Sequence, residues 1–315
     1  MNPPGYNPLV SVVIPTLGRP ELVQRAVRSA LAQTHGNMEV IVVSDGPDPA
    51  TAEALRDFDP RVRHLTVEHG GPAAARNAGV LASAGDWINL LDDDDELLPG
   101  KVAAQLAIAD AEDQRTMIAC RCVFEQAGRK DIWPVRPIGE GESLGDYMLV
   151  RPGLRGRPGQ INLHCLLIPR SLAVAMPSPT FADHEDWAWL LAAEHEGGAR
   201  VRFVWEPLVV YHLSVSEMTR SRRTNWAESL AWADHHRAWL SARAYNSFLA
   251  TKVALKAKRA GDRKGLRLIA GRVLGNRPGV LELGFLFGVL FAPLSLLDNV
   301  WKESLRSDDG AGVST

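Results

Sequence analysis

Short apolar, β-branched runs alternate with stretches of helical spacing along the first third of the chain. The runs are Val10–Ile14, Glu39–Val43, Arg63–Val67 and Asp86–Leu91. Each run ends at proline, glycine or polar residues, which is typical of buried strands. Between them, apolar residues recur every three or four positions in 19–33, 51–58 and 73–82, which indicates helices. This alternation predicts an α/β fold with a doubly wound, mostly parallel sheet flanked by helices.

The pattern after Gly100 is less regular and predicts a second half with mixed elements. We expect helices at 101–113 and 185–196, strands at 116–124, 163–168 and 201–211, and a long loop at 131–158. The stretch from Trp226 to Lys258 has helical composition without strand signals. A helical C-terminal extension is therefore expected to follow the sheet.

Four consecutive carboxylates, Asp92–Asp95, follow the apolar run Trp87–Leu91. Like charges at this density are unfavourable unless a cation neutralises them. Oxygen ligands on a short loop suit a hard divalent ion, Mg²⁺ or Mn²⁺, which also binds phosphates. The alternative is a solvated acidic loop. The position at the carboxyl end of a strand favours a ligand site, because open α/β sheets bind ligands there.

The composition is that of a globular protein, with 46% hydrophobic and 23% charged residues. Three cysteines, Cys120, Cys122 and Cys165, are odd in number and lack zinc-finger spacing. A disulfide framework is therefore not expected, and a cytoplasmic location fits best. The first ten residues have no basic start and no long apolar stretch, so they do not read as a signal peptide.

The C-terminal region carries an uneven charge. Residues 252–277 contain nine Lys or Arg and one acid, a net charge of +8, so the remainder is about −10 in a chain of net charge −2. The 18 residues from Val280 to Leu297 then carry one charge, Glu282, and are interrupted by Pro293. One interpretation of 252–297 is a peripheral anchor to an anionic membrane surface, at the inner face of the cytoplasmic membrane. The other is a buried C-terminal helix packed on the domain.

Six motifs occur in an order that closely resembles glycosyltransferase family 2, over roughly residues 9 to 213. They are Ser11–Thr16, Leu31–Thr34, Val42–Gly46, Ala75–Gly79, Leu91–Asp95 and Glu185–Trp187. The resemblance implies an inverting, metal-dependent transferase of the GT-A fold that uses a nucleotide sugar. It divides the chain into a GT-A domain at 1–222 and a helical region at 223–315. Within the domain, about 9–100 would bind the nucleotide sugar, and 101–222 would hold the acceptor and the catalytic base.

The resemblance assigns four residues to the nucleotide. Pro15 and Thr16 would line the pocket at the end of the first strand, and Arg76 would reach the nucleotide. Asp45 matches a carboxylate that accepts a hydrogen bond from the base, which favours uracil and hence a UDP-linked donor. The structural alternative for Arg76 is an arginine on a helix surface.

The same resemblance assigns the metal. Asp92 and Asp94 match the outer members of the Asp-x-Asp motif, with Asp94 as the direct ligand and Asp92 nearer the ribose. Asp93, which is also expected at the nucleotide, and Asp95 could share these roles with them. His212 stands where some relatives carry a histidine that faces the metal, although a core histidine is equally consistent. The metal would neutralise charge on the leaving nucleotide.

Asp186 matches the catalytic base, which would take the proton of an acceptor hydroxyl as that oxygen attacks the anomeric carbon. Glu185 would sit beside it and raise its pKa through like charge. The structural alternative is that these acids, with Asp183, only favour a helix start. His184 is a further candidate near the base.

Aromatic and loop residues are expected to shape the acceptor site. Trp187 and Trp189 could form a wall that stacks on a sugar, or belong to the core. Residues 131–158 and the stretch around His164 are expected to contribute to acceptor binding. The sequence does not specify the sugar or the acceptor.

Two positions depart from the family pattern. Ser44 replaces the first acid of the usual Asp-Asp-Gly, and Gly18 stands where Asn is common. The processive synthases of this superfamily carry Gln-x-x-Arg-Trp and several spanning helices, and 222–226 does not match that motif. The expected reaction is therefore transfer of a single sugar to a glycan or a lipid-linked glycan in cell-envelope polysaccharide biosynthesis.

Two other functions remain open from the residues alone. A metal-dependent nucleotidyltransferase shares the strand–helix order, but Leu17–Pro20 is a poor version of its glycine-rich phosphate loop. A scaffold that binds nucleic acid or membrane through 252–277 would leave the acidic run unexplained, and the basic segment lacks interleaved aromatic residues. No nucleic-acid partner is expected.

Overall fold

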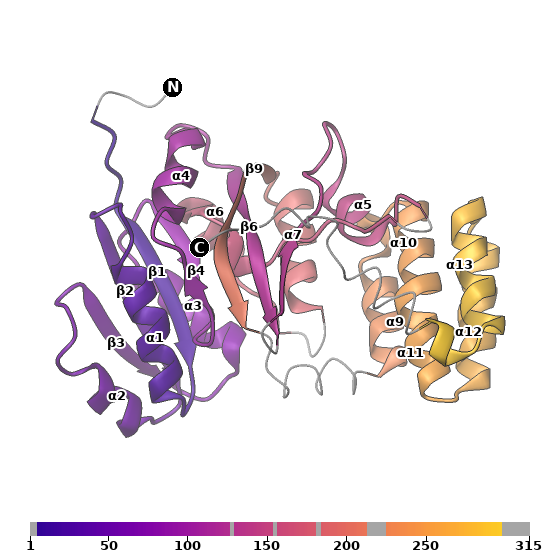
Figure 1. The fold of residues 1–315 in the computed structure, drawn as a ribbon, viewed down its shortest axis with the longest axis horizontal. Coiled ribbons are helices and arrows are strands. Elements are labelled where there is room, and N and C mark those ends of the chain that lie inside the picture. The colour runs from indigo at the N-terminus through magenta and orange to yellow at the C-terminus, as the bar shows by residue number, and fades with distance from the viewer. Residues whose placement is uncertain (1–4, 127–128, 154–155, 181–183, 213–224, 298–315) are drawn as a thin grey trace. The chain divides into compact units, whose positions relative to one another are not determined.

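The computed structural model describes residues 5–126, 129–153, 156–180, 184–212 and 225–297. The chain forms two compact units. The first, here called the α/β unit, comprises Met1–Pro134 and Ile161–His212. The second, the helical unit, comprises Val135–Gln160 and Leu213–Thr315 (Figure 1).

A five-stranded sheet forms the centre of the α/β unit. Its order is β3 (Val62–Val67), β2 (Met38–Asp45), β1 (Val10–Thr16), β4 (Trp87–Leu90) and β8 (Ile168–Pro169). The first four strands are parallel, and β8 pairs antiparallel with β4. Every residue of β1 and β4 is buried, as expected of strands covered on both faces. The prediction of a mostly parallel sheet flanked by helices is confirmed.

Three helices make the crossover connections, and each begins with a proline that fits the first turn. They are α1 (Pro20–Leu31), α2 (Pro49–Leu55) and α3 (Pro72–Ala82). At Gly79 of α3, an added Cβ would lie 2.3 Å from Cγ1 of Val13 on β1. Glycine therefore lets α3 pack directly on the sheet, which fixes the position of the helix that carries Arg76.

A second sheet of four strands completes the α/β unit, in the order β5 (Glu96–Leu97), β9 (Arg200–His212), β6 (Thr116–Gln126) and β7 (Arg129–Trp133). Strands β6 and β9 run parallel, with a register shift at Arg121. Strand β5 pairs antiparallel with β9 directly after the acidic run. The remaining helices of the unit are α4 (Lys101–Ile108), α6 (Arg170–Ala175) and α7 (Glu185–His195).

Three predicted elements differ from the structure. The strand expected at 163–168 is a 3₁₀ turn, η1 (Leu163–Cys165), followed by the short β8. The helix expected to reach residue 113 ends at Ile108, because Asp113 instead accepts the N–H groups of Arg115 and Thr116 in a local turn. The loop expected at 131–158 contains helix α5 (Leu144–Leu149), which Ser143 caps through the Asp146 N–H.

The helical unit packs short helices around a buried centre. Besides α5, it contains α9 (Trp226–His235), η2 (Arg237–Trp239), α10 (Ala242–Phe248), the π-helical segment η3 (Leu249–Val253), α11 (Ala254–Arg259), α12 (Arg263–Gly275) and α13 (Val280–Phe291). The apolar stretch expected at 280–297 thus forms a helix of 12 residues that ends before Pro293. Among the described residues, none of the helices combines the length and apolar character that crossing a membrane requires.

Candidate nucleotide and metal site

Polar side chains gather where the parallel strands end. Thr16 is the last residue of β1, Asp45 is the last residue of β2, and Asp92 follows β4 by two positions. The parallel pairing of these strands brings their carboxyl ends to one edge of the sheet. Thr16 Oγ1 donates a hydrogen bond of 2.6 Å to Asp93 Oδ2, which joins the first strand to the acidic turn. The edge has the arrangement expected of a ligand site in an open α/β sheet.

Basic side chains of the protein contact every carboxylate of the acidic turn. Arg19 lies 2.7 Å from Asp93 and 3.1 Å from Asp94. The other two contacts are Arg76 Nη2 to Asp92 Oδ1 at 2.8 Å and His164 Nδ1 to Asp95 Oδ2 at 3.0 Å. The charge repulsion noted in the sequence is therefore met in part by the protein itself, and two of these partners, Arg19 and His164, were not predicted as such.

Two of the four carboxylates are buried and resist ionisation. Asp93 is 1% exposed, and burial raises its pKa to about 7, against the opposing effects of Thr16 and Arg19. Asp95 is fully buried, and burial raises its pKa to about 6, although His164 favours the ionised form. Neighbouring aspartates raise both values further. Removing charged groups from water is the main cause in each case.

These pKa values predict a pH-dependent stability in the absence of a divalent ion. A carboxyl group whose pKa is higher in the folded state contributes stability at low pH, and this contribution is lost as the pH rises through the folded value. The protein in chelator should therefore lose stability between about pH 4 and pH 7, the window between the usual carboxyl pKa of 3.8 and the raised pKa values of Asp93 and Asp95. Thermal unfolding across this range measures the effect. We expect Mn²⁺ to raise the melting temperature more at pH 8 than at pH 5, and a stability that increases with pH in chelator would contradict the prediction.

Arg76 joins the acidic turn to the start of α7. Arg76 is 9% exposed, and its guanidinium donates from Nη1 to Glu185 Oε1 at 2.5 Å and from Nη2 to Asp92 Oδ1 at 2.8 Å. Burial opposes the charged forms of Asp92 and Arg76, but their mutual attraction lowers the pKa of Asp92 and raises that of Arg76. Arg76 is thus a buried cation between two motifs, and not the surface arginine of the alternative interpretation.

Asp186 and Glu185 lie in the first turn of α7. Burial raises the pKa of Asp186, and the charge of Asp92 raises it further, while Arg76 and a backbone hydrogen bond from Leu163 oppose the shift. Burial likewise raises the pKa of Glu185. A carboxylate with a raised pKa close to a candidate ligand site has the properties of a general base. Asp183 lies outside the described residues.

Asp45 is held by the loop before α3. Its carboxylate accepts hydrogen bonds from the N–H groups of Gly70 at 2.7 Å and Gly71 at 3.0 Å, and it lies 3.0 Å from His69 Nδ1. A carboxylate can accept about four hydrogen bonds, so these three groups leave room for about one further donor. Pro15 is buried in β1 beside Val43 of β2.

The exposure of the carboxylates separates those that could bind a metal from those that hold the turn. The Asp92 side chain is 38% exposed and that of Asp94 is 14% exposed, whereas Asp95 is buried and contacted at both oxygens. Asp95 Oδ1 accepts the N–H of His212, and Oδ2 contacts His164. Asp92, Asp95 and His164 nevertheless offer ligand atoms within 4.8 Å of one another. This oxygen-rich set fits Mg²⁺ or Mn²⁺.

The histidine and aromatic candidates occupy different environments. His212 Nε2 lies 2.8 Å from Glu96 Oε1, so its ring is paired with β5. His184 adopts a left-handed backbone (φ 60°) before α7, and its ring stacks on Trp187 at 4.9 Å. Trp189 is 2% exposed and donates to the Met176 carbonyl, so it belongs to the core as the alternative interpretation held.

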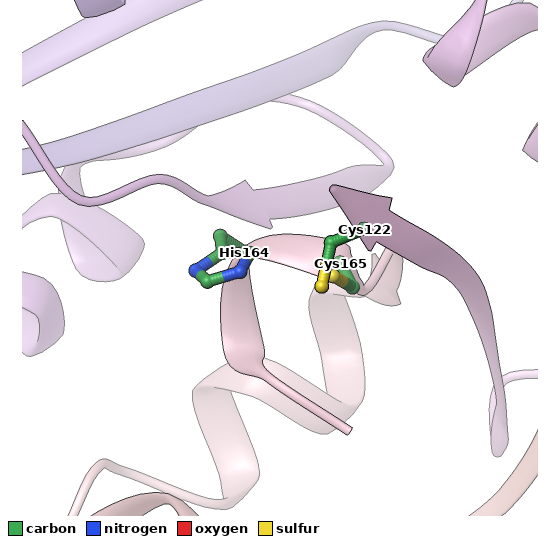
Figure 2. A group of neighbouring side chains, drawn as sticks. All are labelled: Cys122, His164 and Cys165. Atoms are coloured by element: carbon green, nitrogen blue, oxygen red, sulfur yellow. The ribbon is translucent and has the colours of Figure 1, made fainter. Parts of the chain in front are cut away.

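A buried group of soft ligands lies behind the acidic turn. Cys122, His164 and Cys165 place ligand atoms within 4.8 Å of one another, and Figure 2 shows the imidazole beside the two sulfur atoms. Because burial raises the pKa of Cys165 to about 11, its thiol is protonated at neutral pH and packs as a small apolar group. This group could not be predicted from the sequence, because the fold brings β6 and η1 together.

Comparisons with known proteins agree with this fold. The mostly parallel sheet flanked by helices is a GT-A fold. Residues 11–166 match the model of glycosyl transferase family 2. These residues, about half of the chain, place it in glycosyltransferase family 2 through that part.

One curated relative aligns along most of the chain. The amylovoran biosynthesis glycosyltransferase AmsB of Erwinia amylovora is 26% identical over 265 residues, which cover 80% of this chain and 85% of the relative. Three further curated relatives are 33%, 33% and 39% identical, but the chain spans 42%, 39% and 33% of their own lengths.

Two solved structures share the fold. The mannosyltransferase PcManGT of Pyrobaculum calidifontis, in complex with GDP-Man and Mn²⁺, has a TM-score of 0.57 and 15% identity, and the match covers 96% of this chain and 86% of that protein. TarS of S. aureus, in complex with UDP-GlcNAc, has a TM-score of 0.52 and 12% identity, with 84% and 91% covered. At these identities the likeness concerns the fold alone.

Proposed function

We propose that this protein transfers a single sugar, with inversion, from a nucleotide-sugar donor to a hydroxyl of a glycan or lipid-linked glycan in cell-envelope polysaccharide biosynthesis. The observation that carries the proposal is the buried Arg76, whose guanidinium contacts Asp92 of the acidic turn and Glu185 beside Asp186. These carboxylates are more than 90 residues apart in the chain, yet one side chain holds the expected donor and acceptor motifs together.

The proposed roles follow from the environment of each side chain. Asp186 takes the proton of the acceptor hydroxyl. The charge of Arg76 favours the ionised form of Asp186, and the contact between Arg76 and Glu185 holds the start of α7 in place. Asp92 and Asp94 hold a divalent ion, with His212 as a further candidate ligand and Asp93 fixed by Thr16. When bound, such an ion stabilises the negative charge of a departing nucleoside diphosphate.

The donor base is proposed to be uracil, through Asp45. A carboxylate accepts the ring N–H of uracil, although the guanine ring offers a similar donor. Solved structures of the same fold bind both kinds of donor, since TarS holds UDP-GlcNAc and PcManGT holds GDP-Man. Nucleotide binding must therefore distinguish UDP from GDP.

Residues 252–297 are proposed to face an anionic membrane, and this proposal does not depend on the identity of the donor.

Calorimetry tests the donor and the metal together. UDP, GDP, dTDP and CDP are titrated into the protein with and without Mn²⁺. We expect UDP to bind only with Mn²⁺, and its affinity to fall at least tenfold in Asp94→Ala. The matched control is Asp57→Ala, at an exposed aspartate of the α/β unit, which should bind UDP as the wild type does. Tight binding of GDP in place of UDP would replace the donor assignment, and absence of all binding by the folded protein would contradict the proposal.

A further inference from the structure

Helix α13 exposes large apolar side chains and buries its one charged side chain, the opposite of an ordinary surface helix. Val280, Phe287 and Phe291 are 87%, 59% and 74% exposed, whereas the single charged residue of the helix, Glu282, is 3% exposed. With the exposed Gly284, these positions recur at intervals of four, three and four residues, so they form one stripe along the helix. A surface helix normally turns its apolar stripe inward and its charges outward.

The inward face of α13 is already packed. Leu286 and Val289 are buried, and the helix contacts α10, α11 and η3 within the helical unit. Glu282 Oε1 lies 3.7 Å from Arg243 Nε, so the buried carboxylate faces a cation. The outer stripe is therefore a second apolar face, in addition to the one that holds the helix in place. Exposed apolar surface of this kind indicates an interaction site.

Cations lie at the end of α13 that carries the two phenylalanines. Lys258, in the last turn of α11, donates hydrogen bonds of 2.5 Å to the carbonyls of Val289 and Ala292. These bonds fasten the C-terminal end of α13 to the end of α11, where the chain continues into exposed Arg259, Arg263 and Lys264. Because Arg263 follows Lys258 by five residues, its Cα lies at most about 18 Å from that of Lys258.

We propose that the outer stripe of α13, together with Arg259, Arg263 and Lys264, docks on the surface of an anionic lipid bilayer. Aromatic side chains beside basic ones are the combination that inserts at the headgroup boundary and is attracted by anionic lipid. The helix is about 18 Å long, too short for the hydrocarbon core of about 30 Å, so it lies in the plane of the surface. Two copies of this basic face would repel each other, which disfavours self-association as the occupant.

Vesicle co-sedimentation of the full chain tests this surface. The probes are vesicles of phosphatidylcholine alone and of phosphatidylcholine with phosphatidylglycerol, each at low and high salt. We expect the wild type to sediment with the anionic vesicles at low salt only. Phe287→Ser with Phe291→Ser should weaken binding by about tenfold or more, because two large apolar side chains no longer leave water. Arg263→Gln and Lys264→Gln should each weaken binding by about fivefold.

Leu81→Ser is the matched control, since Leu81 is an exposed leucine of α3 in the α/β unit, and it should bind as the wild type does. All five substituted positions are exposed, and circular dichroism is used to check that each variant folds. The proposal is overturned if the wild type does not bind anionic vesicles at low salt, or if the phenylalanine variant binds them equally well. It is also overturned if ultracentrifugation shows a dimer that this variant abolishes while lipid binding is unchanged.

Discussion

Replacing Asp186 by asparagine is expected to lower the rate of sugar transfer by about 10²- to 10⁴-fold, the usual contribution of a general base. Asparagine keeps the size of the side chain but cannot accept a proton from the acceptor hydroxyl. Since Asp186 is not placed at the nucleotide, binding of the nucleoside diphosphate should remain within a factor of two or so of the wild type. Steady-state transfer and calorimetry on the same preparations measure both quantities.

The pH dependence of transfer gives a second view of Asp186. A base works in its ionised form, so activity should rise with pH through the pKa of Asp186, which burial raises above its usual value of 3.8. Glu196→Gln, at the exposed far end of the same helix, is the control and should leave rate and pH profile unchanged. An Asp186→Asn variant with nearly full activity would show that another group is the base.

Replacing Arg76 by methionine is expected to destabilise the protein by about 3–5 kcal/mol at neutral pH. The reason is that removing one partner of a buried ion pair leaves the other charge uncompensated. Here the guanidinium contacts both Asp92 and Glu185, and the Arg76 side chain is 10% exposed. Urea unfolding of wild type and variant at pH 7.5 measures the loss. Arg76→Lys should recover part of it, because the charge returns without the paired hydrogen bonds.

Acidification should reduce the difference between the two proteins. Arg76 helps to hold the pKa of Asp92 below its usual value, so this interaction contributes stability above the unfolded pKa that is lost as the pH falls through the folded one. Burial raises the pKa of Glu185, so on acidification Glu185 is neutralised at a higher pH than an ordinary glutamate. Its attraction to Arg76 is lost at that point. The double variant Arg76→Met with Glu185→Gln should lose less unfolding free energy than the two single variants lose in sum. Equal unfolding of Arg76→Met and wild type at pH 7.5 would contradict this account.

The parallel half of the fold could be predicted because local and tertiary signals agree there. The residues of β1 and β4 are all buried, and each strand of this half ends at a proline, glycine or polar residue visible in the sequence. The second sheet is harder to predict from the sequence, because β6 pairs with a strand more than 80 residues away. Leu163–Ile168 was predicted as a strand because a short buried apolar run has no period that distinguishes a strand from a turn.

The candidate site followed the same division. The motif residues and their order were available from the sequence, but their partners were not. Arg19 and His164 contact the acidic turn through the folded chain, and nothing in their own neighbourhoods indicates it. The C-terminal apolar segment was expected either to anchor the chain or to pack on it. In the structure one face of α13 is packed around Glu282, while the other face carries the exposed phenylalanines.

The two contacts of the Asp95 carboxylate have a consequence for the energetics of ligand binding. One oxygen accepts the backbone N–H of His212 at the end of β9, and the other contacts the imidazole of His164 in η1. The turn that presents Asp92 and Asp94 is thereby clamped to two distant segments of the chain. A donor and its ion would meet carboxylates that are already ordered, and little conformational entropy remains to be lost when they bind. Variants of Asp95 should accordingly weaken ligand binding by loosening the turn, although Asp95 itself need never touch the ligand.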